Sequence, residues 1–357
     1  MIDMMASVSS YSESYKYLVS GSAEMNMPVV PYCGMLWYDI EEAACIPMDY
    51  PLGGVWGQVL SDNSPLKDTF PLPFAVSACW LSLLERKFYI CEEALNLAFI
   101  KKQYKDLEQA DNSDIYFVLG FGCSGLLTLW IQNQKRSIIV MQLQGDEVDM
   151  PMKIFMPVRP DLDKEQFCKL MLKQYGMENS MIISDNTLIK NKFRNRQIQY
   201  NQKYLIEFLR YDKERWLALG PDNIKPVLSY FAEALTDGTY NKLNDGALMK
   251  SHMAGKPKQI AIVLTIEKSE YKAFFWMDEE SIHSVFERFY GAHPETKADF
   301  IIRIDVENKK YELALYRQGL KEPVVIPESA YQLIVFKNKF EDYRSENYNQ
   351  PRGAWIW

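Results

Sequence analysis

The sequence predicts an α+β protein in which two similar β-β-α-β-β units, built mainly from antiparallel sheets, flank a helical connecting region. Two observations predict it. Residues 114–132, DIYFVLGFGCSGLLTLWIQ, form two short apolar runs separated by glycine and serine, which is the pattern of a buried β-hairpin. Residues 257–337 then repeat the same order of apolar runs around one amphipathic segment. A chain of 357 residues is long enough for two or three domains with separate cores.

The composition indicates a globular protein, because 48% of the residues are hydrophobic and charges of both signs are present. The formal net charge of −7 argues against a general nucleic-acid-binding protein. The start of the sequence lacks the basic and apolar regions of a signal peptide, and no apolar run is long enough to span a bilayer. We therefore expect a cytoplasmic protein without a membrane span.

The six cysteines and three histidines do not predict a metal site. No two cysteines have C-x-x-C spacing, and no histidine flanks them. Several cysteines fall within strand-like runs, so we expect free, buried thiols in a reducing compartment. Neither a metal nor a cofactor is expected.

The first half of the chain predicts an arm followed by the first unit. Residues 1–25 are polar and serine-rich and predict a flexible arm. Residues 26–150 predict the first α+β unit, with strands at 75–81, 87–91 and 137–143 around the hairpin. A helix is predicted from Glu92 to about Tyr104, because Glu92 and Glu93 suit a first turn.

Residues 151–250 predict the helical connecting region. The segment DLDKEQFCKLMLKQYG predicts a helix that ends at Gly176. Two further helices are predicted at Asn186–Leu219 and Asn223–Leu235. The first of these carries a basic stretch around Lys190–Arg196.

Residues 251–340 predict the second unit, and 341–357 a C-terminal tail. Strands are predicted at 259–266, 271–276 and 331–336. Asp278 is expected to cap a helix that runs to about Tyr290 and stops at Gly291. The segment DFIIRIDVENKKYELALYRQ predicts a hairpin with one wet face and with Asn308 and Lys309 at its turn. The two predicted units can be aligned with each other at four pairs of similar residues: Glu85 with Glu267, Glu93 with Glu280, Asp114 with Asp299, and Trp130 with Tyr316.

The segment Gly120–Gly125 matches the dinucleotide-binding pattern G-x-G-x-x-G. In nucleotide enzymes this pattern opens a helix whose N-terminus approaches a pyrophosphate. Here the following LLTLWIQ is strand-like, so we interpret the segment as a hairpin turn with positive φ.

No catalytic constellation is evident. In Glu92–Glu93 and Glu279–Glu280 the two residues are adjacent, and adjacent helical side chains point about 100° apart, so neither pair converges on one atom. We interpret both pairs as charges in a helix first turn, and His283 as a packing or surface residue. A triad assembled from distant positions remains open.

Arginine and tryptophan most often anchor protein interfaces, and they supply the candidate partner-binding residues. For the basic stretch the alternative is a solvated helix face, and for the two terminal tryptophans it is docking into a core. The candidates are Arg194, Arg196, Trp216, Trp355 and Trp357.

Several segments resemble the bacterial domain-of-unknown-function family 2931, which includes proteins named as lipoproteins. They are MPVVPYCGMLWYD, GGVWG, LPFAVSACWLSLLERKFY and DIYFVLGFGCSGLLTLW, with weaker matches in KPKQIAIVL, DEESIHSVFERFYG and FIIRIDVENKKYELAL. The resemblance covers most of the chain and implies an α+β fold, but it carries over no active site. Genes of this family lie near secretion and toxin genes, including type VI secretion, which implies an immunity or accessory role. The chain departs from the lipoprotein pattern because it lacks a signal sequence.

The sequence therefore predicts a non-enzymatic protein-binding module. The leading hypothesis is an immunity-type protein that binds and neutralises a cognate bacterial toxin or effector. The alternatives are an enzyme with a pocket between the two units, and a structural component of a secretion or surface system. No nucleic-acid partner is expected, and the sequence does not indicate an oligomeric state.

Overall fold

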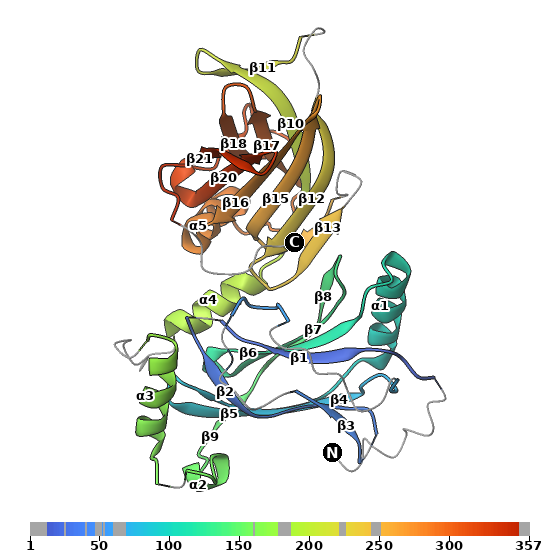
Figure 1. Ribbon diagram of the computed structural model, residues 1–357, viewed down its shortest axis with the longest axis vertical. Coiled ribbons are helices and arrows are strands. Elements are labelled where there is room, and N and C mark those ends of the chain that lie inside the picture. Colours follow the sequence, from blue (N-terminus) through green and yellow to red (C-terminus); the bar gives the residue numbers. More distant parts are fainter. Residues whose placement is uncertain are drawn as a thin grey trace. The chain divides into compact units, whose positions relative to one another are not determined.

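The protein is mixed α+β with mostly antiparallel sheets, as predicted (Figure 1). The computed structural model describes residues 13–24, 26–39, 41–46, 52, 54–59, 69–159, 161–177, 187–220, 226–243 and 251–349. The chain divides into two compact units, Met1–Phe193 and Arg194–Trp357. The boundary lies within helix α4 (Thr187–Gln197).

The described part of the first unit contains two sheets. A four-stranded sheet has the order β1 (Leu18–Ser22), β6 (Tyr116–Phe121), β7 (Leu126–Gln132) and β8 (Ser137–Gln144). A five-stranded sheet has the order β3 (Ala43–Cys45), β2 (Val29–Trp37), β4 (Ala75–Ser82), β5 (Lys87–Ala94) and β9 (Asp146–Val148). The helices are α1 (Leu97–Ala110), α2 (Met152–Phe155) and α3 (Lys164–Gln174), and a short 3₁₀ turn, η2 (Cys123–Gly125), joins β6 to β7.

Both sheets of the first unit contribute to one apolar core. Val76 and Trp80 of β4 pack in the same cluster as Phe117 of β6 and Leu129 of β7. Helix α1 adds its buried face to this cluster, including Ile100. A second cluster contains residues of α2 and α3, so these helices are joined to the unit by buried side chains.

The second unit also contains two sheets among its described residues. One has the order β11 (Arg215–Ala218), β10 (Tyr200–Asp212), β17 (Ala298–Asp305), β18 (Lys310–Tyr316) and β19 (Val324–Val325), with β14 (His252–Ala254) also paired to β10. The other has the order β13 (Tyr240–Leu243), β12 (Val227–Leu235), β15 (Pro257–Ile266), β16 (Ser269–Met277), β20 (Tyr331–Lys337) and β21 (Phe340–Arg344). Helix α5 (Glu279–Tyr290) and the 3₁₀ turn η3 (Glu328–Ala330) complete the unit.

Helix α5 forms where its end signals predicted. The Asp278 side chain accepts a hydrogen bond from the Ser281 amide, and the helix ends at Gly291, whose φ is +57°. Its apolar face, spaced at i, i+3, i+4 and i+7, is buried in the main core of this unit. The predicted cap, length and stop of this helix are confirmed.

The predicted helical region 151–250 is wrong beyond α4. Strand β10 occupies residues 200–212 and β12 occupies residues 227–235, where two helices were expected. In β10 the alternate residues Tyr200, Gln202 and Tyr204 are buried while Lys203 is exposed, which is the period of a strand. The many charges of this stretch hid that alternation.

The predicted arm and the predicted start of α1 are also corrected. Residues 18–22 form β1, which pairs in parallel with β6, and Ser20 and Ser22 are fully buried. A serine is readily buried when its backbone joins a sheet, so the polar composition was misleading. Glu92 and Glu93 lie in β5, and α1 begins only after its cap Asn96. In the predicted tail, β21 extends to Arg344.

The predicted hairpin at 299–318 is confirmed, with Lys309 at φ +53° in its turn. Its second face is less wet than expected, because Ile301 and Asp305 are both buried. Arg303 on that face forms ion pairs with Glu207 at 2.9 Å and Glu312 at 2.7 Å. These pairs connect three neighbouring strands.

Candidate interaction surface

The glycine-rich segment is the turn of a hairpin, as predicted. It joins β6 to β7, which are antiparallel, and Gly125 has φ +77°. The buried Glu85 carboxylate accepts hydrogen bonds from the Ser124 amide at 2.7 Å and the Ser124 hydroxyl at 3.2 Å. A strand follows the turn, so the segment has no helix N-terminus with which to hold a phosphate.

Among the predicted anchors, the structure corrects Arg196. Its side chain is 4% exposed and binds Glu279 of α5 with two hydrogen bonds, the Nη2–Oε2 distance being 2.7 Å. Arg194 is exposed, and Trp216 is half-buried with its ring 5.1 Å from that of Tyr211. Arg194 and Trp216 therefore remain predictions. Trp355 and Trp357 lie outside the described residues.

Lys256 lies beside this ion pair within the second unit. It is 1% exposed, donates to the Asn195 carbonyl, and its ammonium is 5.4 Å from the centre of the Tyr200 ring. Burial lowers the pKa of Lys256 to about 8, although Glu279 and Asp237 act in the opposite direction. Burial of the His283 ring lowers the pKa of His283, and the nearby charge of Lys256 lowers it further.

The side chain of Glu233, in β12, is a buried acid. Glu233 is fully buried and accepts a hydrogen bond from the Asn241 amide at 2.9 Å, while His252 Nε2 is 4.0 Å from its carboxylate. Burial raises the pKa of Glu233 even though Tyr204, Asn241 and His252 act against the rise. Asn241 lies on β13, the strand paired with β12, so this hydrogen bond ties the carboxyl to the neighbouring strand.

The cysteines are free thiols, as predicted, but not all are buried: Cys45 is exposed and Cys33 is half-buried. Burial raises the pKa of Cys79 to about 12 and that of Cys91 to about 11. Such thiols remain protonated at neutral pH and are poor nucleophiles. The two glutamates of the pair Glu279–Glu280 lie in the first turn of α5, as interpreted from the sequence.

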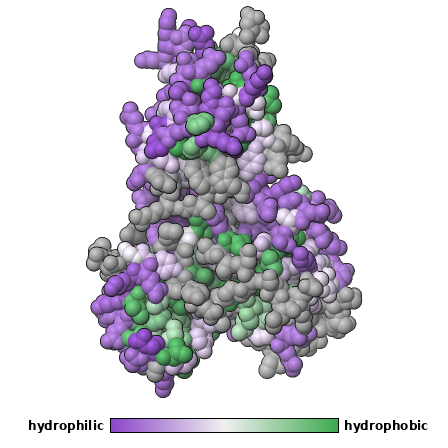
Figure 2. All heavy atoms as spheres, in the orientation of Figure 1, coloured by the Kyte–Doolittle hydropathy of each residue, from purple (hydrophilic) through white to green (hydrophobic). Residues whose placement is uncertain are grey.

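The first unit carries an apolar surface over α2, α3 and the segment between them. Ile154 is 49% exposed, Val158 78% and Leu170 43%. We call this set, with the half-buried side chains Met152, Met156 and Met171 and with the exposed Tyr32 ring 5.8 Å from Phe155, the α2–α3 surface. Figure 2 shows hydrophobic residues gathered on this part of the molecule, at the lower left.

A buried aromatic group supports the α2–α3 surface. The Phe155 ring lies 4.9 Å from Phe88 of β5 and 5.7 Å from Phe167 of α3. Helix α3 is fixed at its start by the Asp163 capping box and ends before Gly176, whose φ is +65°. The exposed apolar side chains therefore stand on an ordered base.

The helices α2 and α3 and the segment between them carry a small excess of basic side chains. Residues 150–177 hold five basic and three acidic side chains, against a net charge of −7 for the whole chain. Glu165 pairs with Lys169 and Arg86, and Asp161 with Arg159. Within the described residues, no ion pair is found for Lys153, Lys164 or Lys173. The positive charge of this part of the chain is thus only partly neutralised.

The second unit has two adjoining depressions of about 300 and 440 Å³. Both are lined by Ser329, Tyr331 and Asn347, and the smaller also by Tyr311 and Tyr343. The sequence did not predict them, because their walls come from separate strands. The sequence does contain one indication of the α2–α3 surface. In the run MPMKIFMPV the apolar residues follow neither a helix nor a strand period, so they cannot all face one core.

Within the described residues, no group of three or more His, Cys, Asp or Glu side chains is placed to hold a metal ion. None of the helices described is both long enough and apolar enough to cross a bilayer. No family model, no curated protein and no solved structure matches the chain.

Proposed function

We propose that this protein is a non-enzymatic binding module that recognises a protein partner through the α2–α3 surface, in the manner of an immunity protein that occludes a bacterial toxin or effector. The observation that carries the proposal is the exposure of Ile154, Val158 and Leu170 beside half-buried methionines. Exposed large apolar side chains gathered on one part of a surface often mark an interaction site. Methionine adapts its shape to an opposing surface, which suits a partner-binding face.

Charge specifies the chemistry of the partner. The unneutralised lysines Lys153, Lys164 and Lys173 favour an opposing surface that carries carboxylates around an apolar centre. Charge at the rim increases the rate of association, whereas the apolar centre supplies most of the affinity. Occlusion of an active site needs roughly 1,200–2,000 Å² of buried surface and no reactive group.

The test is co-expression with each candidate effector encoded by a neighbouring gene, using Val158→Asp as the disrupting change. Val158 is 78% exposed, so the substitution leaves the core unchanged and places a charge within the α2–α3 surface. We expect it to weaken binding of the purified effector at least tenfold, about 1.4 kcal/mol, and to abolish protection of the cells. Val227→Asp, at a 63% exposed valine of β12, is the matched control and should bind normally.

Equal binding by both variants would place the interface elsewhere and reject the α2–α3 surface. Effectors that bind neither the native protein nor either variant, in cells that are not protected, would reject the immunity role.

We also propose that the two units are copies of one ancestral unit. What supports this is a shared pattern of pairing: β1 is parallel to β6 and β10 is parallel to β17, while the remaining neighbours in these sheets are antiparallel. At the same register of the two parallel pairs, Lys16 contacts Asp114 at 3.2 Å and Lys203 contacts Asp299 at 3.3 Å. Superposition of separately determined structures of the two units tests the proposal, and strands that superpose in a different order or direction would reject it.

A further inference from the structure

The smaller depression in the second unit is lined by three tyrosines and two glutamates. Tyr311 is contributed by β18, Tyr331 by β20 and Tyr343 by β21, while Glu328 and Glu346 come from η3 and from the segment after β21. Its volume of about 300 Å³ is at the lower end of the range for small-molecule sites, roughly 300–1,000 Å³. A single small ligand or one side chain fits such a space.

The aromatic walls are fixed by contacts among the residues that line the depression. The rings of Tyr311 and Tyr343 lie 5.3 Å apart at 36°, and the Tyr331 hydroxyl donates to the Tyr311 carbonyl at 3.4 Å. The Asn347 amide donates to the carbonyls of Tyr331 at 2.8 Å and Glu328 at 3.1 Å. These contacts hold the three rings in place before any ligand arrives.

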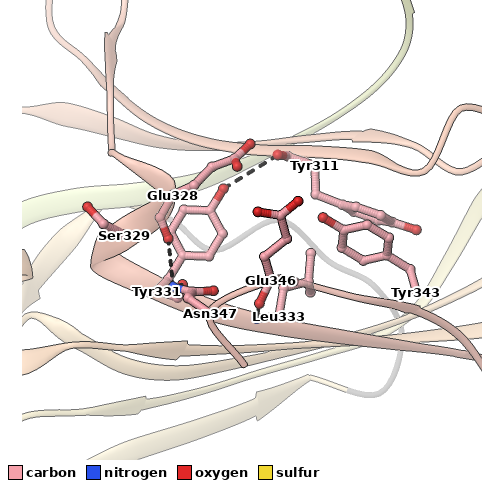
Figure 3. A pocket seen from close by; sticks show the side chains of 9 residues that line it. Tyr311, Glu328, Ser329, Tyr331, Leu333, Tyr343, Glu346 and Asn347 are labelled. Atoms are coloured by element: carbon pink, nitrogen blue, oxygen red, sulfur yellow. Dashed lines mark hydrogen bonds between the residues drawn. The ribbon is translucent and has the colours of Figure 1, made fainter. Parts of the chain in front are cut away.

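Two polar groups that line the depression could still form a hydrogen bond or an ion pair with a ligand. Tyr311 is 4% exposed, and its buried hydroxyl has no hydrogen-bond partner among the described residues. Glu328 is paired with Lys310 at 2.8 Å, but no ion pair is found for the exposed Glu346 within the described chain. Figure 3 shows the Glu346 carboxylate between the Tyr331 ring and the rings of Tyr311 and Tyr343.

The surrounding charge is predominantly negative. Asp342, which precedes Tyr343 on β21, is paired with Lys309 at 3.3 Å, so among the described residues Glu346 is the lining carboxylate for which no ion pair is found. Burial and then the Glu328 carboxylate raise the pKa of Tyr343; Glu346 adds to the rise and Lys310 opposes it. Burial and Glu328 likewise raise the pKa of Tyr331. An anion is disfavoured here, and a cation is favoured.

We infer that this depression binds an organic cation, an ammonium or guanidinium group, between the tyrosine rings and the Glu346 carboxylate. Ring faces attract such cations, and they do so most strongly when the cation is partly desolvated. The carboxylate supplies the counter-charge. The adjoining depression, which shares Ser329, Tyr331 and Asn347, accommodates the remainder of a longer ligand.

The test titrates the full-length protein, labelled with ¹³C in its tyrosine rings, with choline and with its neutral isostere 3,3-dimethylbutan-1-ol. We expect choline to shift the resonances of Tyr311, Tyr331 and Tyr343 with a Kd on the order of 1 mM, and the alcohol to have little effect. Equal affinity for both compounds would show that shape alone is recognised and would overturn the inference, as would the absence of any shift with choline.

Two variants test whether the Glu346 carboxylate and the Tyr343 ring contribute to choline binding. Glu346→Gln, at an exposed position, should weaken choline binding roughly three- to fivefold, and Tyr343→Leu by a similar factor. Glu322→Gln removes another exposed carboxylate of the same unit, outside the depression, and should leave binding unchanged. If Glu346→Gln and Glu322→Gln both bind choline as the native protein does, the assignment is wrong.

A further arm identifies the source of the cation. N-acetyl-arginine amide represents a protein side chain, and choline represents a free quaternary amine. Tighter binding of the arginine derivative assigns the depression to a protein partner, and tighter binding of choline assigns it to a small metabolite; both agree with an organic cation. The inference does not depend on the α2–α3 surface, and Val158→Asp should leave choline binding unchanged.

Discussion

The guanidinium of Arg196 binds the carboxylate of Glu279 with two hydrogen bonds, and the two side chains are unequally buried, 4% exposed for Arg196 and 25% for Glu279. The pair joins the end of α4 to the first turn of α5, where a carboxylate also meets the positive end of the helix dipole. A residue that the sequence suggests as a partner anchor is thus an internal contact of the second unit.

Because Arg196 is more deeply buried than Glu279, we expect replacement of Glu279 to lower stability more than replacement of Arg196. Glu279→Leu leaves the more deeply buried charge unpaired and should lower the free energy of unfolding by about 3–4 kcal/mol, whereas Arg196→Met leaves a carboxylate that reaches water and should cost about 2 kcal/mol. The double variant should lose at least about 1 kcal/mol less than the sum. Urea unfolding at pH 7 measures all three.

The exposed pair Glu165–Lys169 in α3 is the control for that cycle. Its side chains are 55% and 64% exposed, so its coupling energy should be only about 0.3–0.5 kcal/mol. Additive losses at Arg196 and Glu279 would contradict the interpretation of a coupled, buried pair.

Lys256 predicts a rise in stability with pH. Its pKa is lowered to about 8 in the folded protein from an ordinary 10.5, so between these values the unfolded chain binds more protons than the folded one. The free energy of unfolding should therefore increase by about 2 kcal/mol from pH 7.5 to pH 9.5 through this group. In Lys256→Met the increase should be absent. The same slope in both proteins would show that Lys256 is not the source.

Above that range the sign reverses. Burial raises the pKa of Tyr200 to about 12, so this hydroxyl ionises in the unfolded chain first and stability falls as the pH rises past its ordinary value of 10. The measurement for Lys256 therefore ends below pH 10.

Glu233 predicts a stabilising substitution. Burial raises its pKa, so the ionised carboxylate lowers stability increasingly as the pH rises above the ordinary value of 4.5. Glu233→Gln keeps an oxygen to accept from Asn241 and removes the group that can ionise. We expect a gain of about 1 kcal/mol near pH 7 that disappears near pH 4, measured by thermal unfolding at both pH values. A loss at pH 7 would mean that the charge itself is needed.

The sequence predicted those elements whose signals are local. Asp278 and Gly291 bound α5, and the glycines before Leu126 mark the hairpin turn, because caps and turns depend on a few adjacent residues. The serine-rich strand β1 and the charged strand β10 were missed. Each of these pairs in parallel with a strand almost 100 residues away, and that partner, not local composition, determines the strand.

The candidate sites were less predictable for the same reason. Tyr311, Tyr331 and Tyr343 lie on three different strands and have no common spacing. The residue type of Arg196 suggests a partner anchor, but it does not reveal that Glu279 pairs with it. The exposed Val158 was not selected, because exposure of an apolar side chain depends on what fails to pack against it.

Gly125 and Gly176 have similar backbone conformations but different surroundings. Comparing alanine substitutions at the two positions therefore distinguishes the cost of backbone strain from the cost of steric crowding. Gly125 has φ +77°, and a Cβ there would lie 2.5 Å from the Gly145 carbonyl oxygen, whereas Gly176 has φ +65° with nothing within 4 Å of such an atom. Alanine at either position incurs the left-handed conformation, about 1–2 kcal/mol, but only at Gly125 must neighbouring backbone also move. Gly125→Ala should therefore lower the free energy of unfolding by at least about 2 kcal/mol more than Gly176→Ala, as measured by urea unfolding. Equal losses would mean that the turn held by Glu85 can shift, and that its close approach to β8 is not required by the fold.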